Sequence, residues 1–240
     1  ISLSNCCPPN IVRTIAEVAN YAYGLSSDAV AVNLYGGNEL QTIHEGKQLN
    51  IVQTSNYPWE GTASFTLKEF PSDYALKLRV PAWAGKAEIW KNDTKIEAPI
   101  EKGYAVLAGS WKKGDRVTIK LPMEVSFMES NPLVEETRNQ VAVMRGPVVY
   151  CLEKQDVAAD VNIFDLKMKP ATDFVPKHQD ILGQDIVLLE GNAYRTSSTE
   201  WNSLYRRAAA GKQETIPVRL VPYFAWGNRT FGDMSVWLPA

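Results

Sequence analysis

The spacing of apolar residues changes along this chain from a helical period to a period of two. Between residues 8 and 24, apolar side chains recur every three or four positions, which is typical of an amphipathic helix. Pro8 and Pro9 suit the first helical turn, and Gly24 suits the C-terminal cap. The apolar stripe consists of Ile11, Ile15, Val18 and Ala22. Because no other long helical pattern occurs in the chain, we predict that this stripe packs on a partner.

From about residue 29, apolar and polar residues alternate, as in strands that have one buried and one exposed face. In residues 74–80, for example, apolar positions alternate with Lys77 and Arg79. Turn signals at Asn92-Asp93 and at Lys113-Gly114-Asp115 separate segments of this kind. Further alternating segments are residues 64–68, 117–121 and 124–127. Short strands at this spacing predict a mainly β chain built as antiparallel sandwiches or barrels.

A polar segment over residues 128–140, which contains Asn131-Pro132, indicates a seam between two β regions. Residues 165–185 and 191–215 are rich in Pro, Gly, Ser and Thr, so we expect long loops there, with a short helix near residues 204–210. The strands expected after the seam are residues 141–153, 186–190, 216–224 and 234–238.

These patterns divide the chain into one helix and two β domains. We predict a terminal helical segment over residues 1–26, which precedes the β regions. An antiparallel β-sandwich-like domain is expected over residues 27–130, and a second one over residues 131–240.

The composition excludes two classes of protein. The 25 Lys and Arg residues nearly balance the 27 Asp and Glu residues, giving a net charge of −2, and no basic block stands out. We therefore expect no nucleic-acid partner, since binding to phosphates requires concentrated positive charge. No apolar run approaches the roughly 20 residues of a membrane helix, so we expect no transmembrane helix.

The chain starts at Ile1 without an initiator Met, so we expect it to be a segment of a longer protein.

The adjacent thiols of Cys6 and Cys7 are the most informative candidates for chemistry. They lie just before the expected helix, where unpaired N–H groups and the positive end of the helix dipole favour an anion. A thiol in that position is a better nucleophile or metal ligand. Two small buried hydrophobic residues, or a strained disulfide between neighbours, are the alternatives. Two thiolates cannot complete a zinc site, which normally takes four ligands.

The other chemically capable residues suggest structural roles. His44 and His178 are isolated, and we interpret each as a surface histidine. Cys151 lies in an apolar run and is expected in the core. Most of the seven tryptophans are expected to fill the core, and a sugar-stacking platform on a β-sheet is the alternative. The sequence assigns no carboxylate pair to glycoside hydrolysis.

Five ordered motifs resemble those of glycoside hydrolase family 127, the β-L-arabinofuranosidase family, and of its relative, family 146. The first is Cys6-Cys7-Pro8-Pro9-Asn10 with Arg13 following, which is similar to the active-site segment of that family. The other four motifs are Tyr57-Pro58-Trp59-Glu60-Gly61, Val80-Pro81-Ala82-Trp83, Arg145-Gly146-Pro147-Val148-Val149-Tyr150, and the segment from Pro222 to Arg229.

The resemblance implies that residues 1–25 are the last segment of an (α/α)6 barrel that lies upstream, and that the rest is the C-terminal β portion. It also implies a retaining mechanism in which Cys6 is a zinc-bound nucleophile and Cys7 is a zinc ligand. The remaining zinc ligands and the acid/base Glu of the family lie upstream of the segment that matches this chain.

The resemblance further implies two partners, which are an arabinose-containing oligosaccharide or glycan and the upstream barrel. If the barrel is absent, the apolar stripe of the helix would favour either fraying of the helix or association with a second copy of the chain. We expect the 240 residues alone to be inactive. Two alternatives remain open. One is an accessory β-sandwich or carbohydrate-binding module without catalysis, and the other is a redox or metal sensor built on the adjacent cysteines.

Overall fold

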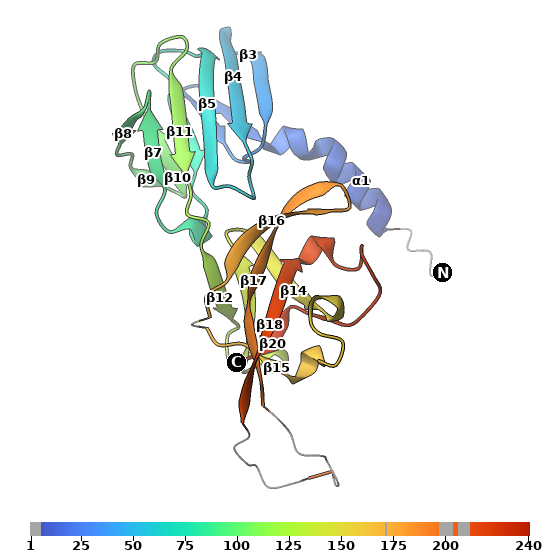
Figure 1. Ribbon diagram of the computed structural model, residues 1–240. Coiled ribbons are helices and arrows are strands. Elements are labelled where there is room, and N and C mark those ends of the chain that lie inside the picture. The colour runs from blue at the N-terminus through green and yellow to red at the C-terminus, as the bar shows by residue number, and fades with distance from the viewer. Residues whose placement is uncertain (1–5, 171, 197–203, 206–211) are drawn as a thin grey trace. The chain divides into compact units, whose positions relative to one another are not determined.

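The computed structural model describes residues 6–170, 172–196, 204–205 and 212–240, and it is mainly β with one α-helix near the N-terminus (Figure 1). The chain separates into two compact units, Ile1–Met123 and Glu124–Ala240. In the part of the chain that is described, no helix has both the length and the apolar character needed to cross a membrane.

The first unit begins with α1 (Cys7–Glu17), a short 3-10 turn, η1 (Val18–Tyr21), and β1 (Tyr23–Ser26). The expected helix over residues 8–24 is therefore too long at its C-terminal end. Gly24 is not a cap but pairs with Ala31 in β2 (Ala29–Val32). The strand β1 forms because its backbone N–H and C=O groups find hydrogen-bond partners in β2. No residue of α1 is buried.

The remaining strands of the first unit form two sheets that share one hydrophobic core. The five-stranded sheet has the order β1-β2-β6-β10-β9, and the six-stranded sheet has the order β3-β4-β5-β11-β7-β8. The bounds not yet given are β3 (Asn38–His44), β4 (Lys47–Ser55), β5 (Thr62–Glu69), β6 (Ala75–Arg79), β7 (Glu88–Lys91), β8 (Thr94–Ile96), β9 (Ile100–Glu101), β10 (Tyr104–Leu107) and β11 (Arg116–Lys120), with the 3-10 turn η2 (Ala82–Ala84).

The alternation read from the sequence matches the buried faces of these sheets. Leu76 and Leu78 of β6 share the core with Phe65 and Leu67 of β5 from the other sheet, which makes a sandwich. One strand pair departs from the expected antiparallel order, because β2 and β6 run parallel. The Asn92-Asp93 turn joins β7 and β8 with positive φ at both residues, as expected from the sequence.

The second unit is built on one continuous nine-stranded sheet. Val148 and Val149 of β14 pair with β13, whereas the following residues of β14 pair with β18, so one strand joins two halves of the sheet. The elements are β12 (Val125–Glu129), β13 (Gln140–Arg145), β14 (Val148–Glu153), β15 (Leu166–Lys167), β16 (Val175–Ile181), β17 (Gln184–Thr196), β18 (Gln213–Pro222), β19 (Met234–Ser235) and β20 (Trp237–Pro239), with the 3-10 turns η3 (Glu135–Thr137), η4 (Lys154–Asp156), η5 (Ile163–Asp165) and η6 (Tyr223–Ala225).

Along the chain, the first unit ends at Met123 and the second begins at Glu124, which is before the expected seam over residues 128–140. The strand β12, which ends at Glu129, belongs to the second unit because it pairs along its length with β13. A division after residue 130 would separate these two paired strands.

The expected loops over residues 165–185 and 191–215 are wrong for most of the described residues, because residues 166–167, 175–181, 184–196 and 213–215 lie in β15, β16, β17 and β18. Residues of β16 and β17 form a hairpin whose turn, Leu182-Gly183, has positive φ at both positions. Nearly all side chains of β16 are exposed, so its sequence carries no alternation of period two. The short helix expected near residues 204–210 falls largely outside the described residues, and so does Trp201.

Candidate functional site

Cys6 and Cys7 lie together at the N-terminus of α1, and both are exposed. Their Sγ atoms are 3.5 Å apart, and neither cysteine is in a disulfide. The carbonyl of Cys6 accepts a hydrogen bond from the N–H of Asn10 at 3.3 Å, which closes the first helical turn. In this chain by itself, the two residues are therefore neither buried nor joined by a disulfide.

The two prolines change the electrostatic argument for these thiols. A side chain at the N-cap normally accepts a hydrogen bond from the N–H two or three residues later. Those residues are Pro8 and Pro9, which have no N–H, and Cys6 makes no such cap hydrogen bond. The expected stabilisation by unpaired N–H groups is therefore wrong at these two positions. The helix dipole remains, and any further stabilisation of a thiolate must come from groups other than these two N–H positions.

The described residues supply an incomplete set of metal ligands. Among them, no group of three or more His, Cys, Asp and Glu side chains is arranged to hold a metal ion. His178 lies in β16, where Nδ1 is 3.0 Å from an Asp185 oxygen, and His44 ends β3. The adjacent thiols have the donor chemistry that zinc prefers, but they provide two of its usual four ligands.

Three residues of the apolar stripe, Ile11, Ile15 and Val18, are exposed, whereas Ala22 is half-buried. Ile11 and Ile15 are 60% and 68% exposed. A cavity of about 420 Å³ continues the stripe within the first unit, lined by Val18, Ala22, Tyr23 and Leu40 among others. This surface is what a helix needs in order to pack on further helices, and no described residue covers it.

Cys151 differs from Cys6 and Cys7 in both its burial and its reactivity. It is buried in β14, as the sequence indicates. Burial, together with the negative charges of Glu153 and Asp156, raises the pKa of the Cys151 thiol to about 12. A thiol with such a pKa stays protonated near neutral pH and is inert as a nucleophile.

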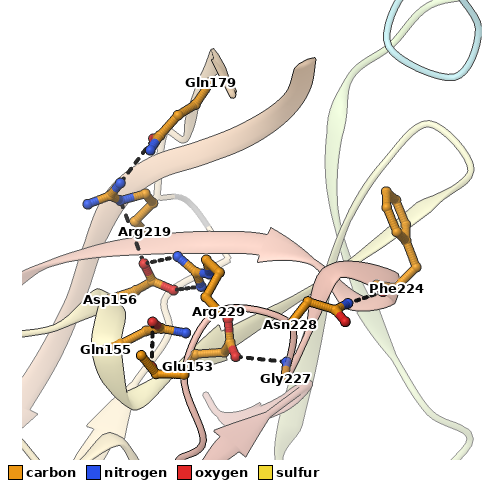
Figure 2. A network of polar contacts seen from close by, with 10 residues as sticks. Glu153, Gln155, Asp156, Gln179, Arg219, Phe224, Gly227, Asn228 and Arg229 are labelled. Carbon is orange, nitrogen blue, oxygen red and sulfur yellow. Dashed lines mark hydrogen bonds and ion pairs between the residues drawn. The ribbon is translucent and has the colours of Figure 1, made fainter. Parts of the chain in front are cut away.

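The second unit contains a buried ionic cluster that the sequence analysis missed (Figure 2). Arg229 forms ion pairs with Glu153 and Asp156, whose side chains are only 4% and 2% exposed. Its Nη1 donates to Asp156 Oδ1 at 2.9 Å, and these interactions raise the pKa of the guanidinium. The N–H of Gly227 donates to Glu153 at 3.1 Å. Arg219 lies 3.8 Å from Asp156. The cluster holds the segment after β18 against β14 and η4.

Only part of the expectation for the tryptophans is met. Trp111 is buried and its indole N–H donates to the carbonyl of Tyr74 at 2.7 Å. Trp226 is 44% exposed, and its ring lies parallel to that of Tyr223, with centroids 6.1 Å apart. The tryptophans that are half-buried are Trp59, Trp83, Trp90 and Trp237.

Each of the two units matches a model of a protein family, and both models belong to the same family. Residues 125–239 match the model described as the glycoside hydrolase family 127 C-terminal domain. Residues 29–123 match the model described as beta-L-arabinofuranosidase, GH127 middle domain. Both matches fall within single compact units of the structure.

Individual relatives agree with the family models. The chain is 33% identical, over 96% of its length, to a non-reducing end beta-L-arabinofuranosidase of Bifidobacterium longum subsp. longum. It is 36% identical to the crystal structure of a GH127 beta-L-arabinofuranosidase from Geobacillus stearothermophilus T6, with a TM-score of 0.90 over 98% of the chain. A structure called a glycoside hydrolase is 42% identical, with a TM-score of 0.91 over 98% of the chain.

The relatives are much longer than this chain. The match spans 36% of the Bifidobacterium protein, 37% of the Geobacillus structure and 39% of the third structure.

Proposed function

The chain belongs to glycoside hydrolase family 127, and from this membership we propose that it is part of an enzyme that releases β-L-arabinofuranosyl groups from glycans. The activity in the names of the similar proteins supports this substrate class. The observation that carries the proposal is the pair of exposed thiols at the start of α1, in a chain whose two units both match this family.

In the proposed reaction, Cys6 is the nucleophile of a retaining mechanism. The Cys6 thiolate attacks the anomeric carbon of the terminal sugar, and a C–S bond forms as the glycosidic C–O bond breaks. The leaving oxygen takes a proton from an acid that lies outside this chain. Water then attacks the same carbon, the C–S bond breaks, the thiolate is restored, and the proton of the water passes to the conjugate base of that acid.

Cys7 and Cys6 are proposed as two ligands of a zinc ion. Bound zinc would keep the sulfur of Cys6 deprotonated near neutral pH. This fits the cap geometry, because Pro8 and Pro9 offer the thiolate no N–H donors and a bound cation would supply the stabilisation that they do not. Two thiols leave the coordination incomplete, so the other ligands are proposed to lie upstream in the longer protein.

An upstream (α/α)6 barrel is the proposed partner of α1. The exposed stripe of α1 needs a helical partner, and the relatives extend well beyond the segment they share with this chain. The proposed active site is therefore shared, with the nucleophile contributed by α1 and the acid by the barrel.

The test is a pair of cysteine variants in the longer protein that carries this chain. Cys6→Ala should lower the release of arabinose from a β-L-arabinofuranoside by about a thousandfold or more, because no nucleophile remains. Cys151→Ala is the matched control, since that thiol is buried in the second unit, and it should leave turnover unchanged. Turnover by the Cys6→Ala protein at the rate of the parent would contradict the proposal.

A glycan-binding module without catalysis is the second candidate. The exposed rings of Tyr223 and Trp226 favour it, because aromatic faces are suited to stacking on sugars. The two candidates differ at Cys6. In a pure binding module, Cys6→Ala would leave glycan affinity unchanged and there would be no turnover to lose.

A further inference from the structure

The second unit contains a hollow of about 550 Å³ whose walls combine aromatic rings with polar groups. Its volume lies in the range of about 300–1,000 Å³ that is usual for small-molecule sites. The hollow is formed by η3, the start of β13, η5, η6, β19 and β20, and every residue that lines it belongs to the second unit.

Three aromatic side chains line this hollow: Phe164, Tyr223 and Trp237. Phe164 is 58% exposed and Tyr223 is 47% exposed, so their rings are available to a ligand. Trp226 stacks on Tyr223 and extends the aromatic surface beyond the hollow. Exposed rings are costly in water, and a group of them in one place indicates a binding surface.

Polar side chains interrupt the aromatic walls. Glu136, Thr137, Gln140 and Ser235 also line the hollow. The Thr137 hydroxyl is 2.6 Å from that of Ser130, and the Ser235 hydroxyl donates to the Trp237 carbonyl at 2.6 Å. Within the described part of the chain, Glu136 has no ion-pair partner. Its carboxylate and the amide of Gln140 are suited to hydrogen bonds with hydroxyl groups.

The segment that carries Tyr223 and Trp226 is tied to β14 on both sides, and Figure 2 shows the contacts that Gly227 and Arg229 make on its C-terminal side. Tyr223 follows directly on β18, whose last residue, Pro222, is paired with Tyr150 of β14. On the other side, the N–H of Gly227 and the guanidinium of Arg229 are held by Glu153. The segment that bears the rings is thus fixed at both ends, and a site that is ordered in advance binds at a lower entropic cost.

We propose that this hollow is a second glycan site, separate in residues from Cys6, which binds neutral arabinose-containing oligosaccharides. The rings of Tyr223 and Phe164 would stack on the apolar faces of the sugars, and Gln140 and Glu136 would bind their hydroxyl groups. The negative charge of Glu136 selects neutral sugars over uronic acids, since like charges repel. The choice of arabinose rests on the proposed function, but the site itself does not.

A neutral oligosaccharide fits these walls better than another segment of polypeptide does. The centres of protein interfaces are depleted of charged residues, because a carboxylate buried there loses its hydration. Covering this hollow with protein would bury Glu136, whereas a sugar offers hydroxyl groups that replace the lost water.

The experiment is an isothermal titration calorimetry measurement, in which arabinotriose, a neutral trisaccharide, is titrated into the 240-residue chain. The parent chain should bind arabinotriose saturably, and digalacturonate, a disaccharide of an acidic sugar, should bind more weakly. Tyr223→Ala should weaken binding about tenfold and Gln140→Ala about fivefold. Phe231→Ala is the matched control, because this exposed ring does not line the hollow, and it should bind as the parent does.

Three results would overturn the proposal. The first is the absence of saturable binding to the parent chain, and the second is unchanged binding in both hollow variants. The third is equal binding by the longer Cys6→Ala protein with and without Gln140→Ala, since the hollow would then be a contact surface for the rest of the polypeptide and the binding that remains would belong to the proposed active site. Thermal unfolding of each variant shows whether it is folded, and Gln140→Ala is the decisive variant if Tyr223→Ala does not fold. None of these results depends on turnover, which tests the proposed function separately.

Discussion

At the scale of single residues, this chain places its charged groups in two different environments. The cluster of Arg229 with Glu153 and Asp156 is buried, and its members depend on one another. Most other ion pairs, such as that of Arg138 and Glu135, are exposed and contribute little to stability. The consequence of removing an arginine should therefore differ greatly between the two environments.

Arg229→Met should lower the free energy of unfolding of the second unit by about 3–5 kcal/mol, because it removes the guanidinium that pairs with two buried carboxylates. Arg138→Met, at an exposed pair in the same unit, should change it by less than about 0.5 kcal/mol. Urea unfolding of both variants measures the difference. Equal effects would show that the cluster does not stabilise the unit.

Asp115 couples the stability of the first unit to pH. Burial by itself would raise the pKa of this carboxyl, but hydrogen bonds from Asn92 at 2.9 Å and from the Lys112 amide at 3.0 Å, with the ion pair to Lys91, outweigh it. The pKa is therefore lowered below its ordinary value.

A lowered folded-state pKa means that the Asp115 carboxylate stabilises the fold above the unfolded value of about 3.9, and that this contribution is lost as the pH falls through the folded value. Asp115→Asn should cost about 1–3 kcal/mol at pH 7. The difference from the parent should shrink as the pH falls from about 5 to about 2. Urea unfolding across this range measures it, and a difference that stays constant would contradict the assignment.

At the scale of elements, close approaches of the backbone explain one motif of the family resemblance. Gly61, the last residue of Tyr57-Pro58-Trp59-Glu60-Gly61, precedes β5 and accepts a hydrogen bond from the N–H of Leu121 at 2.8 Å. A Cβ atom added at Gly61 would lie 1.9 Å from the carbonyl oxygen of Leu121. This position requires glycine because two backbone segments meet there.

Gly61→Ala should lower the free energy of unfolding of the first unit by about 2–3 kcal/mol, since the backbone must move to admit the methyl group. Gly36→Ala is the matched control, because a Cβ atom added there would meet no heavy atom within 4 Å and its φ is ordinary. Thermal unfolding compares the two. A Gly61→Ala chain as stable as Gly36→Ala would rule out the steric explanation.

At the scale of the whole molecule, the described residues supply only part of the active site proposed above. Its described residues bring two thiols together and no further metal ligand, and they leave the apolar face of α1 open. Each unit buries its own set of apolar side chains and matches its own family model.

The 240-residue chain should therefore release no arabinose from a β-L-arabinofuranoside, whereas the longer protein that carries it should. The physical reason is that the proposed function assigns the acid and the remaining zinc ligands to the rest of the longer protein. A reducing-sugar assay of both proteins at equal concentration measures this. Turnover by the chain alone would show that its own residues complete the site.

The sequence by itself determined the features that depend on neighbours along the chain. Alternation of period two identified strands such as β5, β6 and β11, because burial of one face imposes that pattern. Pro8 and Pro9 located the start of α1 and, with it, the position of the two thiols. The Asn92-Asp93 turn was predictable because few residues accept two consecutive positive φ angles.

Tertiary structure decided what depends on residues far apart in the sequence. Gly24 became a strand residue through pairing with Ala31, and β16 formed without an apolar face because it pairs with β17. Arg229 meets Asp156 across 73 residues, which no local pattern encodes. The hollow beside Tyr223 arises in the same way, since six separate elements contribute its walls. Local periodicity fixes which face of an element is apolar, and only long-range pairing fixes what that face, or a charge beside it, will meet.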